Sequence, residues 1–116
     1  MLVSVFKALS ETTRLYILAS CSQNEFYTCQ LVQALNLSQS TVSSHIKILK
    51  DARLLKSRRY KTWSGYYLNP DLPGEMKQLI QDILSRVYRD KEWQQFHERL
   101  LDARTRLEVC PETERR

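Results

Sequence analysis

At 116 residues the chain has the length of one small domain, so we expect a single cooperative unit. Its 18 Lys and Arg residues against 13 Asp and Glu residues give a net charge of +5, which suits a polyanionic partner such as nucleic acid. No stretch approaches the roughly 20 apolar residues of a membrane span, and no amphipathic helix combines a basic face with an aromatic one, which disfavours a membrane protein.

The N-terminal part is predicted to form three helices. Apolar residues between Leu2 and Leu9 recur at helical spacing and predict the first. A second helix is expected from about Glu11 to Cys21, with Ser10 as its N-cap. A polar connection follows, and Thr28 is expected to cap a third, short helix that ends at Leu35.

A fourth helix is predicted from Gln39 to about Ala52, and Ser38 can cap it. Its apolar residues Val42, Ile46 and Leu49 are spaced by three or four and are expected to be buried. The opposite side is polar and basic, and it carries Ser40, Thr41, Ser43, Ser44, His45, Lys47 and Lys50.

A β-hairpin is predicted after the fourth helix. Residues 54–59 and the aromatic stretch Trp63–Leu68 are expected to be its strands, with a polar tip at Tyr60–Thr62. From Lys47 to Lys61 there are seven basic residues and one acidic residue. We therefore expect the hairpin to extend the positive charge of the fourth helix.

Helical spacing returns after the hairpin. An apolar stripe runs from Met76 to Tyr88, loses phase across residues 89–92 and resumes on a shifted face from Trp93 to Leu107. This pattern indicates either one bent helix or two helices. The stripe at 76–88 is wider than one small core can bury, so part of it is expected to face a second subunit.

Two short helices joined by a tight turn, the second led by small polar residues, are typical of a helix-turn-helix that reads the major groove. A helical pair with a merely solvated polar face, or one that contacts protein, is the alternative, and the basic hairpin favours DNA. The hairpin would meet the minor groove or phosphates. The residues predicted to contact DNA are Gln39, Ser40, Thr41, Ser43, Ser44, His45, Lys47 and Lys50 of the helix, and Arg58, Arg59 and Lys61 of the hairpin.

Three segments resemble the ArsR/SmtB family of winged-helix metal-responsive repressors: VFKALSETTRLYIL, LVQALNLSQSTVSSHIKILKDARLL and RRYKTWSGYYLNP. The resemblance covers about Leu2–Pro70. It implies a mainly α winged helix-turn-helix fold with a small two-stranded β wing, and a homodimer held by the first and last helices. The expected single domain, residues 1–116, comprises a helix-turn-helix at 27–52, a wing at 54–69 and a C-terminal dimerisation and sensing region at 72–109.

The resemblance also implies a function. Such a repressor binds double-stranded operator DNA and leaves it when a metal or metalloid binds. Two departures from the family pattern are Arg53 and Lys61, which stand at or beside positions where glycine is usual. The end of the fourth helix and the turn of the wing are therefore expected to be irregular.

Three cysteines are the candidate inducer ligands. Cys29 matches the second of two cysteines that some family members carry at the start of the third helix, and the first turn of a helix favours a thiolate. Cys21 and Cys110 could complete a site of three soft thiolates, which suits trivalent arsenic or antimony better than zinc. Whether all three form one site, and whether that site spans two subunits, is left open by the sequence.

The same residues are compatible with other functions. The main alternative is a thiol redox or persulfide-sensing repressor of the same fold, and another is a constitutive DNA-binding protein whose cysteines are dispensable. An enzyme is not expected, because no nucleophile–base motif, glycine-rich phosphate loop or paired carboxylate is present. The odd cysteine number and the lack of a signal-like apolar N-terminus indicate the cytoplasm.

Overall fold

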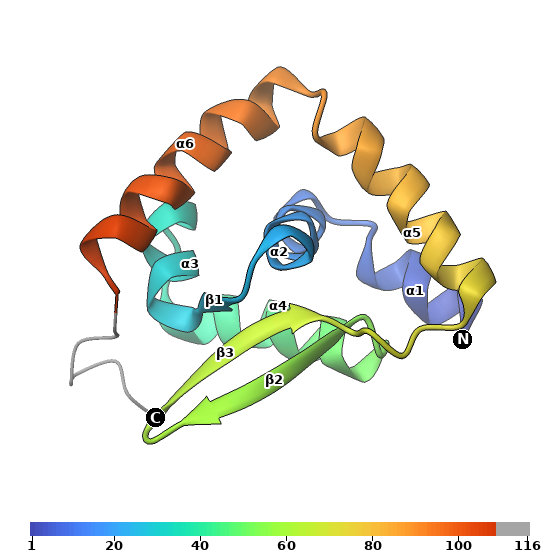
Figure 1. Cartoon of the computed structure of the whole chain (residues 1–116), viewed down its shortest axis with the longest axis horizontal. Coiled ribbons are helices and arrows are strands. Elements are labelled where there is room, and N and C mark those ends of the chain that lie inside the picture. Colours follow the sequence, from blue (N-terminus) through green and yellow to red (C-terminus); the bar gives the residue numbers. More distant parts are fainter. Residues whose placement is uncertain (109–116) are drawn as a thin grey trace.

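Helices precede and follow the β-hairpin along the chain (Figure 1). The computed structural model describes residues 1–108. Within this range the elements are α1 (Leu2–Ala8), α2 (Thr12–Gln23), β1 (Phe26–Tyr27), α3 (Thr28–Leu35), α4 (Gln39–Asp51), β2 (Leu55–Tyr60), β3 (Trp63–Leu68), α5 (Gly74–Val87) and α6 (Lys91–Arg106).

The predicted mainly α fold with a β wing is confirmed, but the sheet has one more strand than expected. The two-residue strand β1 pairs antiparallel with β3, so the strand order is β1-β3-β2. A sequence of two residues carries no periodicity, which is why this strand was not predicted. The order makes β2 an edge strand, in register with β3 from Leu55 opposite Leu68 to Tyr60 opposite Trp63.

The core forms around α2, which lies at the centre of the molecule with the other helices and the sheet around it (Figure 1). Ile17 and Leu18 of α2 are fully buried. The predicted inner residues of α4, Val42, Ile46 and Leu49, are buried as well. Packing of this stripe fixes which side of α4 is left for solvent or a partner.

Two of the three predicted helix caps are wrong by one residue. Ser38 caps α4 as predicted. The N-cap of α2 is Glu11, whose carboxylate accepts a hydrogen bond from the Thr13 amide at 3.2 Å, because the Ser10 hydroxyl is donated to the end of α1. The N-cap of α3 is Tyr27, so Thr28 is the first helical residue.

The two positions where glycine is usual are strained as predicted. Arg53 and Lys61 have φ angles of 64° and 53°, in the left-handed region that favours glycine. At Arg53 this conformation ends α4: its amide donates to the Lys50 carbonyl at 2.9 Å, and the Leu54 amide donates to the Leu49 carbonyl at 3.0 Å. Lys61 makes the turn between β2 and β3.

The C-terminal region is two helices rather than one bent helix. Asp90 caps α6 by accepting a hydrogen bond from the Glu92 amide at 3.3 Å. The helix then packs its buried Trp93 and Phe96 against Tyr16 of α2. Figure 1 shows that α6 runs back along α3. No helix within residues 1–108 is long and apolar enough to cross a membrane.

Candidate DNA interface and cysteine positions

The outer side of α4 presents small polar side chains followed by lysines. Ser38 fixes the start of the helix, because its hydroxyl oxygen accepts from the Thr41 amide at 3.2 Å and its proton is donated to Thr41 Oγ1 at 2.8 Å. Gln39 is half-exposed. The remaining predicted contacts that are exposed on this side are Ser40, Thr41, Ser43, Ser44, Lys47 and Lys50.

The two lysines of α4 have different surroundings. Lys47 Nζ lies 2.8 Å from Asp51 Oδ2, and this hydrogen bond raises the pKa of the lysine. Lys50 Nζ donates to Ser57 Oγ of β2 at 3.1 Å. Lys50 therefore lies at the junction between α4 and the wing (β2 and β3), and it continues the basic surface from one to the other.

His45 is largely buried, contrary to the expectation that it lies on the exposed side of α4, and its contact with DNA stays a prediction. Its side chain is only 15% exposed, with Nδ1 3.1 Å from an Arg14 guanidinium nitrogen and Nε2 3.4 Å from Glu11 Oε2. Arg14 also donates to the Ala8 carbonyl at 2.7 Å. His45 thus belongs to a polar cluster that joins α4 to the ends of α1 and α2.

Strand alternation separates the two arginines of the wing. Ser57 is opposite Tyr66, which packs against the core, and the Ser57 hydroxyl accepts the Lys50 hydrogen bond from α4. Arg59, two residues further along β2, is on the same face of the sheet as Ser57. Its Nε donates to the Lys61 carbonyl at 3.2 Å, at the tip of the hairpin.

Arg58 lies on the opposite, outer face of the sheet. It is paired with Gly65 in the register, its guanidinium carbon is 5.1 Å from the centre of the Tyr67 ring, and one guanidinium nitrogen is 3.9 Å from Glu25 Oε1. Arg59 therefore shares the side of α4 and Arg58 does not, while the contact of both arginines with DNA stays a prediction.

Cys29 is in the first turn of α3, as predicted. Its side chain is nearly buried, at 2% exposure, and the residue is disulfide-bonded, whereas Cys21 is a free thiol. The neighbouring Gln30 is also buried and joins two parts of the chain. Its Oε1 accepts from the Tyr27 amide and its Nε2 donates to the Leu107 carbonyl, both at 2.8 Å. The end of α6 is thereby fixed beside the start of α3.

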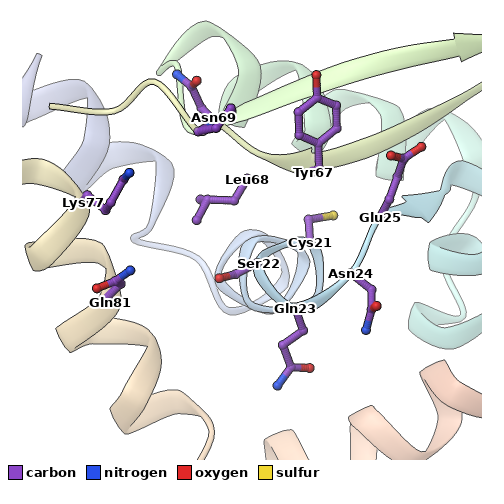
Figure 2. Close-up of a pocket in the computed structure, with 11 residues that line it drawn as sticks. Cys21, Ser22, Gln23, Asn24, Glu25, Tyr67, Leu68, Asn69, Lys77 and Gln81 are labelled. Carbon is purple, nitrogen blue, oxygen red and sulfur yellow. The ribbon is translucent and has the colours of Figure 1, made fainter. Parts of the chain in front are cut away.

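Cys21 lies in the core at the end of α2, beside a cavity of about 410 Å³. Figure 2 shows its sulfur on the side of Glu25 and Tyr67, with Lys77 and Gln81 of α5 across the cavity. Burial and the Glu25 charge raise the pKa of the Cys21 thiol well above its usual value. A thiol that resists ionisation is a weak candidate for a metalloid ligand, and the three-cysteine site stays a prediction.

Cys110, the third predicted ligand, lies outside the described residues. Among residues 1–108 no group of three or more His, Cys, Asp or Glu side chains is arranged to hold a metal ion. Any inducer site that uses Cys29 would therefore need a ligand from beyond residue 108 or from another molecule.

Known proteins resemble this chain over most of its length. A family model described as "Bacterial regulatory protein, arsR family" matches residues 11–57. The arsenical resistance operon repressor of Bacillus subtilis is 36% identical over 87 residues, which cover 74% of this chain and 80% of the relative. The chain belongs to the ArsR family. An arsenic resistance transcriptional regulator of Pseudomonas putida is 40% identical over 81 residues, covering 69% of this chain and 70% of the relative.

Solved structures of ArsR-family regulators have the same fold. Reduced HlyU from Vibrio cholerae has a TM-score of 0.63 at 32% identity, over 76% of this chain and 88% of that one. The homodimeric winged helix-turn-helix domain of a possible ArsR-family regulator from Mycobacterium bovis has a TM-score of 0.62 at 25% identity. The match covers 75% of this chain and 81% of that one. This chain is accordingly a DNA-binding transcriptional repressor of the ArsR family.

Four residues that position the candidate DNA interface and Cys29 were not predicted from the sequence. The Glu25 side chain lies directly against Gly65 of β3, and Gln30 and Arg14 make hydrogen bonds to elements far away in the chain. Each depends on a partner at least 31 residues away, which no local pattern reveals. Gly65 was the one with a signal, since an isolated glycine in a strand often marks a close approach.

Proposed function

We propose that the protein is a homodimeric repressor of a metalloid-resistance operon, that it binds palindromic operator DNA, and that arsenite or antimonite releases it. One observation carries the DNA interface: small polar residues from Ser40 to Ser44, Lys50 and the wing residues Arg59 and Lys61 form one exposed polar and basic surface. Such a surface can contact phosphates through its cations and base edges through its hydroxyl groups. The inducer class is supported by the names of the arsenical resistance relatives.

Exposed apolar residues support the homodimer. Leu2, Val3 and Phe6 of α1 are 48%, 65% and 54% exposed, which is unusual for adjacent large apolar residues. Leu79 and Ile83 of α5 are partly exposed. In Figure 1 α1 and the N-terminal half of α5 are at the same end of the molecule, and we propose that these residues share one interface. The homodimeric Mycobacterium bovis relative is consistent with it.

The inducer would bind at the first turn of α3. The hydrogen bond from Gln30 to the Leu107 carbonyl keeps the end of α6 beside Cys29, and three residues of chain can extend at most about 11 Å. Cys110 follows Leu107 by three residues in the sequence, and we propose it as the second sulfur ligand. After reduction, two thiolates and a third ligand from solvent or a small thiol would hold trivalent arsenic, which prefers sulfur.

Binding there would act on the reading helix through α3. Holding Cys29 on an ion would displace the first turn of α3, and α3 is followed directly by the turn into α4. A small rotation would move the two recognition helices of the dimer away from the spacing of one DNA turn. Release requires arsenite to bind the DNA-free form more tightly, by about 1.4 kcal/mol for each tenfold loss of operator affinity.

The test uses a duplex that the reduced protein selects from a random library. Fluorescence anisotropy should show tight binding by the parent and by Cys29→Ser, and no binding by Ser43→Glu, which puts a carboxylate against phosphate. Arsenite should release the parent and Cys21→Ala, but not Cys29→Ser or Cys110→Ser. Binding by Ser43→Glu at parental affinity would reject the interface. Release of Cys29→Ser at the parental arsenite concentration would reject the inducer site.

A second candidate is a redox switch on the same two cysteines, which the disulfide-bonded state of Cys29 favours. Hydrogen peroxide would oxidise the two thiols to a disulfide, with both thiol protons and two electrons passing to the peroxide to give two waters. In the same assay, peroxide without arsenite should then release the parent, and dithiothreitol should restore binding. Release by peroxide but not by arsenite would select the redox function.

A further inference from the structure

Arg58 is close enough to the proposed DNA interface to reach it, yet it is held away. It belongs to β2, which is an edge strand of the sheet, and it is three residues before Lys61 of the turn. From an edge strand, a long and flexible guanidinium side chain can reach around to either face of a sheet. The side chain is 58% exposed, so packing does not confine it.

Glu25 faces the Arg58 guanidinium together with Tyr67 and Tyr60, and it is the one of these three residues that carries a full negative charge at neutral pH. This residue lies between α2 and β1 and extends its carboxylate across β3 to the outer face of the sheet. One of its carboxylate oxygens is 3.9 Å from the Arg58 guanidinium, and its side chain is 24% exposed. A hydrogen bond to Glu25 also raises the pKa of Tyr60, so the same carboxylate contacts two residues of β2.

Gly65 provides the space for this carboxylate. A Cβ at position 65 would lie 2.9 Å from Glu25 Cδ and 3.0 Å from Cγ, and closer still to one carboxylate oxygen. Any other residue at this position would force the Glu25 side chain to move. The pairing of Arg58 with Gly65 in the strand register brings the three residues together.

We propose that Glu25 is a specificity-determining residue for DNA binding. Its carboxylate pairs with the Arg58 guanidinium, which would otherwise be available to bind a DNA phosphate. The wing then contacts DNA through Arg59 and Lys61, which share the side of α4. This inference rests on the proposed DNA interface. A free cation on the wing would bind the phosphates of any sequence, so its removal lowers non-specific binding while leaving the base contacts of α4 intact.

The experiment measures the salt dependence of binding to the selected duplex and to a scrambled duplex of the same length. Glu25→Gln frees Arg58 and should steepen the slope of log K against log salt by about 0.9, which means an extra factor of about 3.5 between 50 and 200 mM salt. The gain in affinity at low salt should be larger for the scrambled duplex. Arg58→Ala alone should leave the slope unchanged, and Glu25→Gln/Arg58→Ala should restore the parental slope.

Three further variants control the result. Gly65→Ala displaces the carboxylate without changing any charge and should act like Glu25→Gln. Asp102→Asn breaks an ion pair of 2.7 Å with Arg106 on α6 and makes the same change in net charge, and it should have no effect. Arg59→Ala should lower the slope by about 0.9.

These outcomes separate the two hypotheses. An unchanged slope in Arg59→Ala rejects the proposed interface. Suppose instead that Arg59→Ala lowers the slope by about 0.9, as expected for the proposed interface. The role of Glu25 alone is then rejected if folded Glu25→Gln has the parental slope, or if Arg58→Ala has a lower slope than the parent.

Discussion

Cys21 and Cys29 have the same exposure, 2%, but different chemistry. Cys29 is in the first turn of a helix, where amide groups favour a thiolate, and the end of α6 is beside it. Cys21 is at the end of a helix in an apolar core, and burial opposes its ionisation. The two cysteines therefore differ in their surroundings, although both are buried.

Replacing Cys21 should change stability and leave regulation intact. Cys21→Ser buries a hydroxyl in place of a thiol and should lower the free energy of unfolding by about 1–3 kcal/mol, measured by urea denaturation. Cys21→Ala keeps the site apolar and should cost less. Because the pKa of the thiol is raised, iodoacetamide at pH 8 should label Cys21 in the parent only after unfolding. Rapid labelling of the native protein would contradict the burial argument.

For single residues, the sequence predicted burial along α4 well, but it did not predict which face of an element every polar side chain occupies. The inward residues of α4 were correct because burial there follows helical periodicity. His45 was assigned to the wrong side of α4 because its partners, Arg14 and Glu11, come from another helix. The two wing arginines were treated alike, although alternation along a strand separates them once the register is known.

At the scale of elements, a residue in a strained conformation ends α4, and another makes the turn of the wing. Arg53 and Lys61 adopt positive φ values that cost an L-residue roughly 1–2 kcal/mol. The two backbone hydrogen bonds that end α4, from the amides of Arg53 and Leu54, compensate for this cost at Arg53, and the pairing of β2 with β3 compensates for it at Lys61. The sequence predicted both irregularities, since the family pattern has glycine there. It could not predict β1, which exists only because β3 lies beside it.

Glycine at position 53 should therefore stabilise the protein. Arg53→Gly removes the steric cost of the left-handed conformation and loses part of the gain to the entropy of the unfolded chain, for a net increase of about 0.5–1 kcal/mol in the free energy of unfolding. Arg53→Ala, the control, keeps the steric cost and should show no increase. Thermal and urea unfolding measure both variants. Equal stability of the two would mean that the strain at Arg53 is negligible.

For the whole molecule, only part of the apolar stripe at 76–88 is buried in the core, and the proposed dimer assigns the exposed part to a subunit interface. Ile80 and Leu84 are buried, and Met76 and Val87 pack against the same core. Ile83 is partly exposed on a different side of α5. Sequence periodicity predicted one broad stripe, but it could not divide the stripe between a core and an interface, because both are apolar.

The division predicts opposite outcomes for two lysine substitutions on α5. Ile83→Lys, alone or with Phe6→Lys, places charge in the proposed subunit interface and should give folded monomers by sedimentation, with far-UV circular dichroism unchanged. Ile80→Lys places an unpaired charge in the core and should unfold the chain. Folded monomers should also bind the selected duplex far more weakly, because one subunit reads only half of a palindromic site. A well-folded dimer of Ile83→Lys/Phe6→Lys would show that the subunits meet through another surface, and the exposed apolar residues of α1 would then need a different partner.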